Sequence, residues 1–123
     1  KAVGAAFVPA MEPPRMARSA PPVAERRSVD RAIECIGCGM CLSACTMAAH
    51  NPRFPGPAAL NRAFTLQADS RDTGQGERWP VLLSEDALVR CHGQTSCTEV
   101  CPMELPLTES ILTLRRRAVA RLF

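Results

Sequence analysis

The pattern of apolar positions along the chain predicts helices and no strands. One amphipathic stretch runs from Pro57 to about Asp69, and a second runs from Thr108, a good N-cap residue, to Leu122. Their mostly apolar faces consist of residues three or four positions apart: Leu60, Ala63, Phe64 and Gln67 in the first, and Ile111, Leu114, Ala118 and Leu122 in the second. Residues 42–49 can form a further short helix. We therefore expect an all-α fold.

Proline and arginine set the first part of the chain apart. Residues 1–30 hold five of the eleven prolines, many alanines and scattered arginines, so we expect this segment to be extended instead of packed. Residues 31–123 are then the folded domain. The Arg-rich opening is typical of an organelle leader, and a plain linker explains it equally well. Residues 69–76 are rich in turn-forming residues and are predicted to be an exposed loop.

Composition and charge argue against a membrane-spanning segment and against nucleic-acid binding. The apolar opening from Ala2 to Met11 is broken by Pro9, and no stretch approaches the roughly 20 apolar residues that cross a bilayer. The net charge of +3 comes without a basic stripe and interleaved aromatics, so nothing points to nucleic acid. Five aromatic residues are few for a packed core, so we expect a bound group to help hold the domain together.

All seven cysteines fall in two short runs. The first run spaces them as C-x2-C-x2-C-x3-C, which is how bacterial-type ferredoxins surround a cubane cluster of four irons. Its members are Cys35, Cys38, Cys41 and Cys45. Gly37 and Gly39 lie between the first three and allow a tight loop that points their thiolates inward. The first run therefore predicts an iron-sulfur site.

The second run has the same spacing with one cysteine missing. It extends from Cys91 to Cys101, ends in Pro102, and has Gln94 in the missing position. In two-cluster ferredoxins the fourth cysteine of a run binds the other cluster. If that crossing holds here, Cys35, Cys38, Cys41 and Cys101 bind a 4Fe-4S cluster, and Cys45, Cys91 and Cys97 remain. Three thiolates suit a 3Fe-4S cluster, a cubane without one corner, and the count of seven closes without remainder.

Other uses of the cysteines fit the pattern less well. An odd count confined to two runs argues against a disulfide framework. Zinc sites of the C-x2-C type take four ligands, so seven thiolates would leave three over. A thioredoxin-type C-x-x-C lies between a strand and a helix, and neither run has that setting.

Further motifs occur in a recognisable order around the cysteines. They are E-C-I-G-C-G-M-C-L-S-A-C from Glu34, N-P-R-F-P-G-P-A-A-L from Asn51, D-S-R-D from Asp69, R-C-H from Arg90 and C-T-E-V-C-P from Cys97. In residues 33 to about 118 the chain closely resembles the cluster-bearing C-terminal half of the iron-sulfur subunit of succinate dehydrogenases and fumarate reductases. The resemblance implies an α-helical ferredoxin domain, built as two cysteine loops, each followed by a helix, around two clusters.

The resemblance also implies an electron path and a set of partners. Electrons come from a flavoprotein subunit through a 2Fe-2S cluster, then through the 4Fe-4S and 3Fe-4S clusters, to ubiquinone beside membrane-anchor subunits. Succinate would be oxidised on the partner, so no catalytic residue is expected on this chain. The chain would lie at the matrix side of the mitochondrial inner membrane, or at the cytoplasmic face of a bacterial membrane.

The chain departs from the family at its N-terminal side. No cysteines are present for the 2Fe-2S domain, so that half must come from another polypeptide. A split subunit of mitochondrial complex II, as in some protists, has this organisation, and a fragment of a longer chain is the alternative.

A second departure concerns quinone. The family's proline after the fourth cysteine is Thr46 here, and the tryptophan that contacts quinone aligns with His50. An imidazole N–H can replace an indole N–H as donor, so His50 is a candidate quinone ligand. His92 matches a histidine beside the 3Fe-4S cluster, where either support of the quinone or a structural role fits.

Two rival functions use the same helical domain. One is a soluble two-cluster ferredoxin, and the other is an electron-transfer subunit like those of heterodisulfide reductase or anaerobic glycerol-phosphate dehydrogenase. Both are expected to have two complete four-cysteine runs. Gln94 argues against both, because it removes the eighth ligand.

Overall fold

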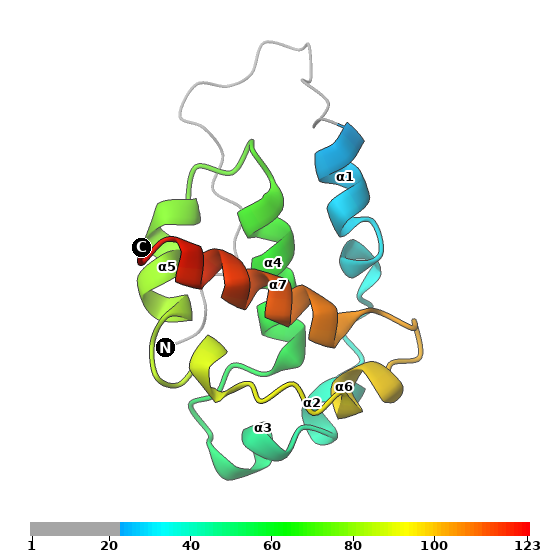
Figure 1. Ribbon diagram of the computed structural model, residues 1–123. Coiled ribbons are helices and arrows are strands. Elements are labelled where there is room, and N and C mark those ends of the chain that lie inside the picture. Colours follow the sequence, from blue (N-terminus) through cyan, green and yellow to red (C-terminus); the bar gives the residue numbers. More distant parts are fainter. Residues whose placement is uncertain (1–22) are drawn as a thin grey trace.

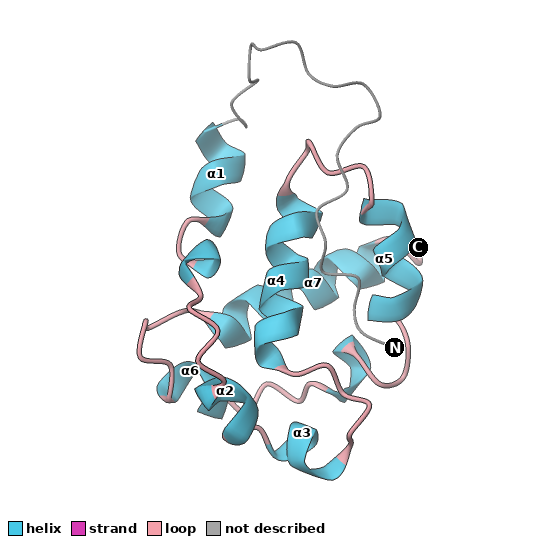
Figure 2. Cartoon of the chain, turned by 180° about the vertical axis from the view of Figure 1, so that it is seen from behind, coloured by secondary structure: helices cyan, strands magenta, loops and turns pink. Residues whose placement is uncertain are grey.

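The computed structural model describes residues 23–123. The longer helices are α4 (Pro57–Ala68) and α7 (Leu107–Ala120). Shorter helices precede and connect them: α1 (Val23–Val29), η1 (Ala32–Glu34), α2 (Met40–Ser43), α3 (Thr46–His50), α5 (Gln75–Leu82), η2 (Leu88–Arg90) and α6 (Ser96–Glu99), where η1 and η2 are 3₁₀ helices. The part of the chain from 23 to 123 contains no strand (Figure 2), so the predicted all-α class is confirmed there.

The core forms where α7 lies across α4 (Figure 1), and this pair of helices shares the most extensive contact. Both predicted apolar faces point into it. The buried residues are Leu60, Ala63 and Phe64 from α4, and Ile111, Leu114 and Ala118 from α7. Burying a leucine side chain stabilises a fold by about 1.5–3 kcal/mol, so this contact supplies much of the stability of the domain. One cysteine run precedes α4 in sequence and the other precedes α7, so this contact also holds the two runs at one end of the molecule.

The predicted C-terminal helix is present, but both of its ends differ from the prediction by one or two residues. It begins at Leu107 and not at an N-cap Thr108, whose hydroxyl instead lies 2.8 Å from that of Thr98. It ends at Ala120, and Leu122 is 64% exposed, so Leu122 does not belong to the buried stripe.

Two further predictions are corrected. The segment predicted to be extended is helical at Val23–Val29, where Val29 is buried in the core; residues 1–22 lie outside the described part. The single short helix predicted over residues 42–49 is two helices, α2 and α3, because the backbone of Cys45 is extended between them.

The predicted exposed loop at 69–76 is partly buried and leads into a helix that the sequence did not reveal. Asp72 is 3% exposed, its carboxylate lies 2.8 Å from the guanidinium of Arg78, and it accepts a bond from the Gly74 amide. These contacts fix the start of α5, whose Trp79 and Leu82 reach the core.

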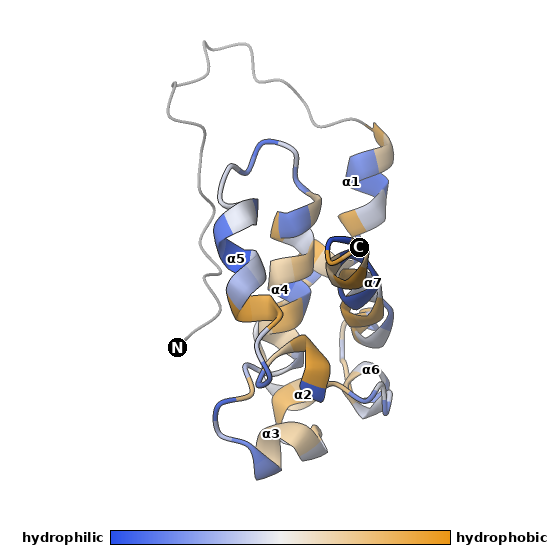
Figure 3. Cartoon of the chain, turned by 60° about the vertical axis from the view of Figure 1, so that its left-hand side comes forward, coloured by the Kyte–Doolittle hydropathy of each residue, from blue (hydrophilic) through white to orange (hydrophobic). Residues whose placement is uncertain are grey.

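The cysteine-bearing helices gather at one end of the molecule, where α2 contacts both α3 and α6. Figure 3 shows that the short helices α2 and α3 are mostly apolar. Cys41, Leu105 and Leu107 form a second small buried cluster there. This end therefore has an apolar interior of its own, separate from the α4–α7 core.

Candidate metal centres

The first cavity is lined by four of the cysteines, Cys35, Cys38, Cys41 and Cys101. It is completed by mostly apolar side chains, among them Leu105 and Leu107. All four thiols are free. Three come from the first run and one from the second, so the structure brings together the set that the sequence assigned to a 4Fe-4S cluster.

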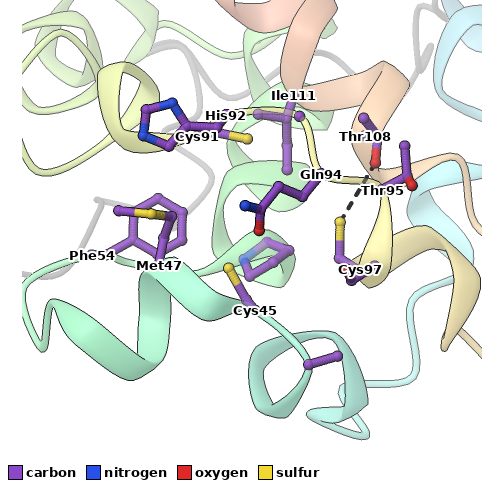
Figure 4. Close-up of a pocket in the computed structure, with 14 residues that line it drawn as sticks. Cys45, Met47, Phe54, Cys91, His92, Gln94, Thr95, Cys97, Thr108 and Ile111 are labelled. Carbon is purple, nitrogen blue, oxygen red and sulfur yellow. Dashed lines mark hydrogen bonds between the residues drawn. The ribbon is translucent and has the colours of Figure 1, made fainter.

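The second cavity is lined by Cys45, Cys91 and Cys97. One thiol comes from the first run and two come from the second. Figure 4 shows that Gln94 extends into the space between Cys45 and Cys91, whereas the ring of His92 lies on the side of Phe54 and Met47. The three cysteines assigned to a 3Fe-4S cluster therefore line one cavity, and Gln94 is a further residue of its lining.

The two cysteine loops have the same local construction. In the first, Cys35 follows directly after η1, Gly37 and Gly39 have φ of +69° and +78°, and α2 follows with Cys41. Left-handed backbone at both positions turns the loop tightly, and glycine adopts it without a steric cost. The amides of Leu42 and Ser43 then bond to the Gly39 carbonyl at 3.0 and 3.1 Å, which starts α2.

The second loop repeats these steps. Here Cys91 follows directly after η2, Gly93 and Thr95 have φ of +70° and +64°, and α6 follows with Cys97. The amides of Thr98 and Glu99 bond to the Thr95 carbonyl at 2.8 and 3.1 Å. In this repeat, Gln94 stands where the first loop has Cys38.

Burial acts on the thiols themselves. It raises the pKa of Cys41 and of Cys91, and neighbouring thiols add to the rise: Cys35 and Cys97 act on Cys41, and Cys97 and Cys45 act on Cys91. A backbone bond from Ala58 opposes the shift at Cys41, and Gly93 and Arg115 oppose it at Cys91. The influence of Cys97 on both thiols indicates that the two cavities are neighbours.

Several polar contacts around the second cavity were not found from sequence. The Thr108 hydroxyl lies 3.6 Å from the Cys97 sulfur, and the Arg115 guanidinium donates to the Cys91 carbonyl at 3.2 Å. Both residues lie on α7, at positions facing the second loop. The sequence carried no signal for these contacts.

The two candidate quinone residues lie in different settings. His92 lines the second cavity, but His50 does not. The Nδ1 atom of His50 lies 2.8 Å from the Thr46 carbonyl oxygen, which can only accept, so Nδ1 carries the proton. In a neutral ring the exposed Nε2 is then an acceptor, and it donates to a quinone oxygen only when the ring is doubly protonated.

The donor sets fit iron-sulfur clusters. Thiolates are soft ligands, typical of Fe–S groups, and each set of cysteines faces one enclosed space. Across residues 23–123, no three His, Cys, Asp or Glu side chains converge on the position of a single ion. Cys35, Cys38, Cys41 and Cys101 would hold one cluster, and Cys45, Cys91 and Cys97 the other. No described helix is both long and apolar enough to cross a bilayer.

A family model described as a 4Fe-4S dicluster domain matches residues 31–105. Among curated proteins, the succinate dehydrogenase iron-sulfur subunit of Paracoccus denitrificans is 36% identical over 101 residues, which cover 81% of this chain and 39% of that protein. The fumarate reductase iron-sulfur subunit of Escherichia coli O157:H7 is 44% identical over 68 residues, covering 55% and 28%. The mitochondrial succinate dehydrogenase [ubiquinone] iron-sulfur subunit 3 of Arabidopsis thaliana is 37% identical over 95 residues, covering 76% and 31%.

These matches confirm the resemblance that the motifs indicated, and the chain spans less than half the length of each of these relatives. Among solved structures, a chain of the Mycobacterium smegmatis Sdh1 complex in the apo form superposes with a TM-score of 0.82 at 22% identity. That superposition covers 94% of this chain and 49% of the other, and it supports the fold. Together with the dicluster family model, it confirms the predicted helical ferredoxin class.

Proposed function

Since the chain belongs to the 4Fe-4S dicluster domain family, we propose that it is the electron-transfer subunit of a succinate:quinone oxidoreductase. It would relay electrons between a flavoprotein, where succinate is oxidised, and ubiquinone. The proposal is supported by relatives named as succinate dehydrogenase and fumarate reductase iron-sulfur subunits.

The observation that carries the proposal is the crossed division of the cysteines. Each cavity takes most of its thiols from one run and one thiol from the other, with Cys101 crossing to the first cavity and Cys45 crossing to the second. If each run formed a complete site by itself, none of its cysteines would line the cavity of the other run. The four-and-three division supports a 4Fe-4S cluster in the first cavity and a 3Fe-4S cluster in the second.

When bound, the two clusters would accept and release single electrons at fixed positions. The residues of this chain hold and tune them. The thiolates bind iron, the left-handed loops place those thiolates, and mostly apolar side chains line the rest of the first cavity. The charge of Arg115 close to Cys91 favours the more negative, reduced state of the second site.

The proposed partners are those of a succinate:quinone oxidoreductase. A 2Fe-2S domain on a separate N-terminal half-subunit would pass electrons to the two clusters of this chain. A flavoprotein subunit would feed electrons in, and membrane-anchor subunits would hold quinone near the second cavity, whose wall includes His92. A mitochondrial relative and a bacterial one support either the matrix side of the inner membrane or the cytoplasmic face of a bacterial membrane as the location.

Low-temperature electron paramagnetic resonance (EPR) of the anaerobically purified complex, with iron and sulfide analysis, tests this function. We expect a three-iron signal in the oxidised protein and a four-iron signal that appears on reduction. Two four-iron clusters would instead favour a soluble ferredoxin or a subunit like that of heterodisulfide reductase. Protein without iron and sulfide would contradict the proposal.

A further inference from the structure

The repeat between the two cysteine loops assigns a position to Gln94. Cys35 and Cys91 each follow a 3₁₀ helix, a left-handed glycine comes two residues later, and a second left-handed residue precedes the next short helix. Between the two left-handed residues, the first loop has Cys38 and the second has Gln94. The backbone therefore delivers the Gln94 side chain to its cavity as it delivers the Cys38 thiol to the first.

The Gln94 side chain is also held in one orientation. The Thr46 hydroxyl donates to the Gln94 Oε1 at 2.6 Å, from the first residue of α3. Thr46 directly follows Cys45, so this bond joins the two cysteine runs across the second cavity. Figure 4 shows the Gln94 amide between Cys45 and Cys91. Because Thr46 engages the oxygen, the amide NH₂ group is the end that remains available to the cavity.

We propose that Thr46 and Gln94 form a positioning pair for the second cluster, in which Gln94 fills the place of the fourth ligand and presents an N–H donor to it. The inference rests on the proposed function. Hydrogen bonds to the sulfur atoms of a cluster stabilise its more negative, reduced state and so raise its midpoint potential. Thr46 decides which end of the amide is presented: without it, the carbonyl oxygen is free to turn inward.

Both residues are exposed, and Gln94 lines the cavity while Thr46 lies between two of its lining residues in sequence, Cys45 and Met47. A hydroxyl at position 46 is needed for this bond. The neighbouring His50 ring does not compete for it, because the ring bonds to the Thr46 backbone carbonyl. The pair is thus independent of the candidate quinone residue.

The first test is a redox titration of the complex with dithionite, in which each oxidised cluster takes up one electron and EPR reports the second cluster. Gln94→Leu keeps the bulk of the side chain and removes the amide. We expect it to shift the reduction equilibrium about tenfold toward the oxidised cluster, a fall of about 59 mV for one electron. Thr46→Val should shift it in the same direction by less, and Thr46→Ser, which retains the hydroxyl, should leave it unchanged.

The second test uses the repeat directly. Gln94→Cys places a thiol where the first loop has Cys38, so it should convert the second cluster to a four-iron form, with loss of the three-iron signal and a gain of one iron per chain. The four-iron signal of the first cavity reports in every sample that the variant is folded. If Gln94→Leu lacks the four-iron signal of the first cavity, the redox titration is done with Thr46→Val and Gln94→Asn instead.

The outcomes separate the pair from the function. A wild-type complex without a three-iron signal would overturn the proposed function. A wild type with that signal, whose potential is the same in Gln94→Leu and Thr46→Val, would overturn the positioning pair alone. A higher potential in Thr46→Val than in the wild type would mean that the Gln94 carbonyl faces the cluster in the wild type. That result would also overturn the positioning pair.

Discussion

Cys101 lines the same cavity as Cys38, although the two residues belong to different cysteine runs. The exchange is mutual, because Cys45 of the first run lines the cavity of the second. We therefore expect crossed losses: Cys101→Ala should abolish the four-iron signal, and Cys45→Ala the three-iron signal. EPR and iron analysis of the two variants, with Ser43→Ala as a control within the first run, provide the check. Loss of the cluster of the residue's own run would contradict the crossed assignment.

His50 provides a prediction about quinone. If its imidazole contacts quinone, His50→Ala should lower quinone reduction by the assembled complex while flavin-dependent reduction of an artificial acceptor and both EPR signals stay unchanged. His92→Ala is the comparison, because His92 lines the second cavity and its loss should also alter the EPR line shape there. Unchanged quinone reduction in His50→Ala would rule out His50 as a quinone ligand.

The buried ion pair between Asp72 and Arg78 should be important for stability. The side chains are 0% and 4% exposed, so removing one partner leaves a charge in the interior, at a cost of about 3–5 kcal/mol. Arg78→Leu should lower the free energy of urea unfolding of the cluster-loaded chain by that order. The matched control is Arg71→Leu, whose pair with Asp69 lies at the surface and contributes about 0.2–1 kcal/mol. Equal effects of the two variants would contradict the distinction.

Gly56 should not tolerate a side chain. Its φ of +89° and ψ of +164° are adopted almost only by glycine, and a Cβ there would lie 2.6 Å from the Leu42 Cδ1 atom. Gly56→Ala should therefore destabilise the fold by about 1–3 kcal/mol in the same assay. Gly76→Ala, inside α5 with open space around it, should instead stabilise by about 0.4–1 kcal/mol. A neutral Gly56→Ala would show that the Gly56 backbone relaxes.

Loading of clusters should depend on pH. Burial raises the pKa of Cys41 and Cys91, and a thiol binds iron only after it loses its proton. Protons therefore compete with iron near neutral pH, and the yield of reconstitution with ferrous iron and sulfide should rise from about pH 7 to pH 9. A peptide of residues 33–46, whose thiols are unburied, controls for the titration of sulfide. The same pH profile for chain and peptide would contradict the effect of burial.

The sequence predicted the grouping of the cysteines better than the small helices. The spacing of each run, together with the crossing of the fourth cysteine in two-cluster ferredoxins, grouped the cysteines as they line the two cavities. The break at Cys45 was missed because Leu42, Ala44 and residues 47–49 are good helix formers on both sides of it. Only the extended backbone that turns Cys45 toward the second cavity interrupts it.

Helix α5 and α1 were missed for a different reason. Gly74, Gly76 and Pro80 suggest a loop, yet the buried Trp79 and Leu82 and the Asp72–Arg78 pair stabilise a helix there through tertiary contacts. In α1, the prolines of the first 22 residues dominated the composition and concealed the helix formers that follow. The spacing of the second run put Gln94 in the position of the missing cysteine. The backbone dihedral angles, which the sequence does not give, show that this position is equivalent to that of Cys38 in the first loop.

During biosynthesis, neither cavity is complete until both cysteine runs have left the ribosome. The first cavity waits for Cys101, near the end of the chain, and the second waits for Cys91 and Cys97 to meet Cys45. A nascent chain that has exposed only its first run holds four thiols without either finished site. Cofactor delivery must therefore follow synthesis of the second run, and a premature stop anywhere before Cys101 leaves the first site incomplete.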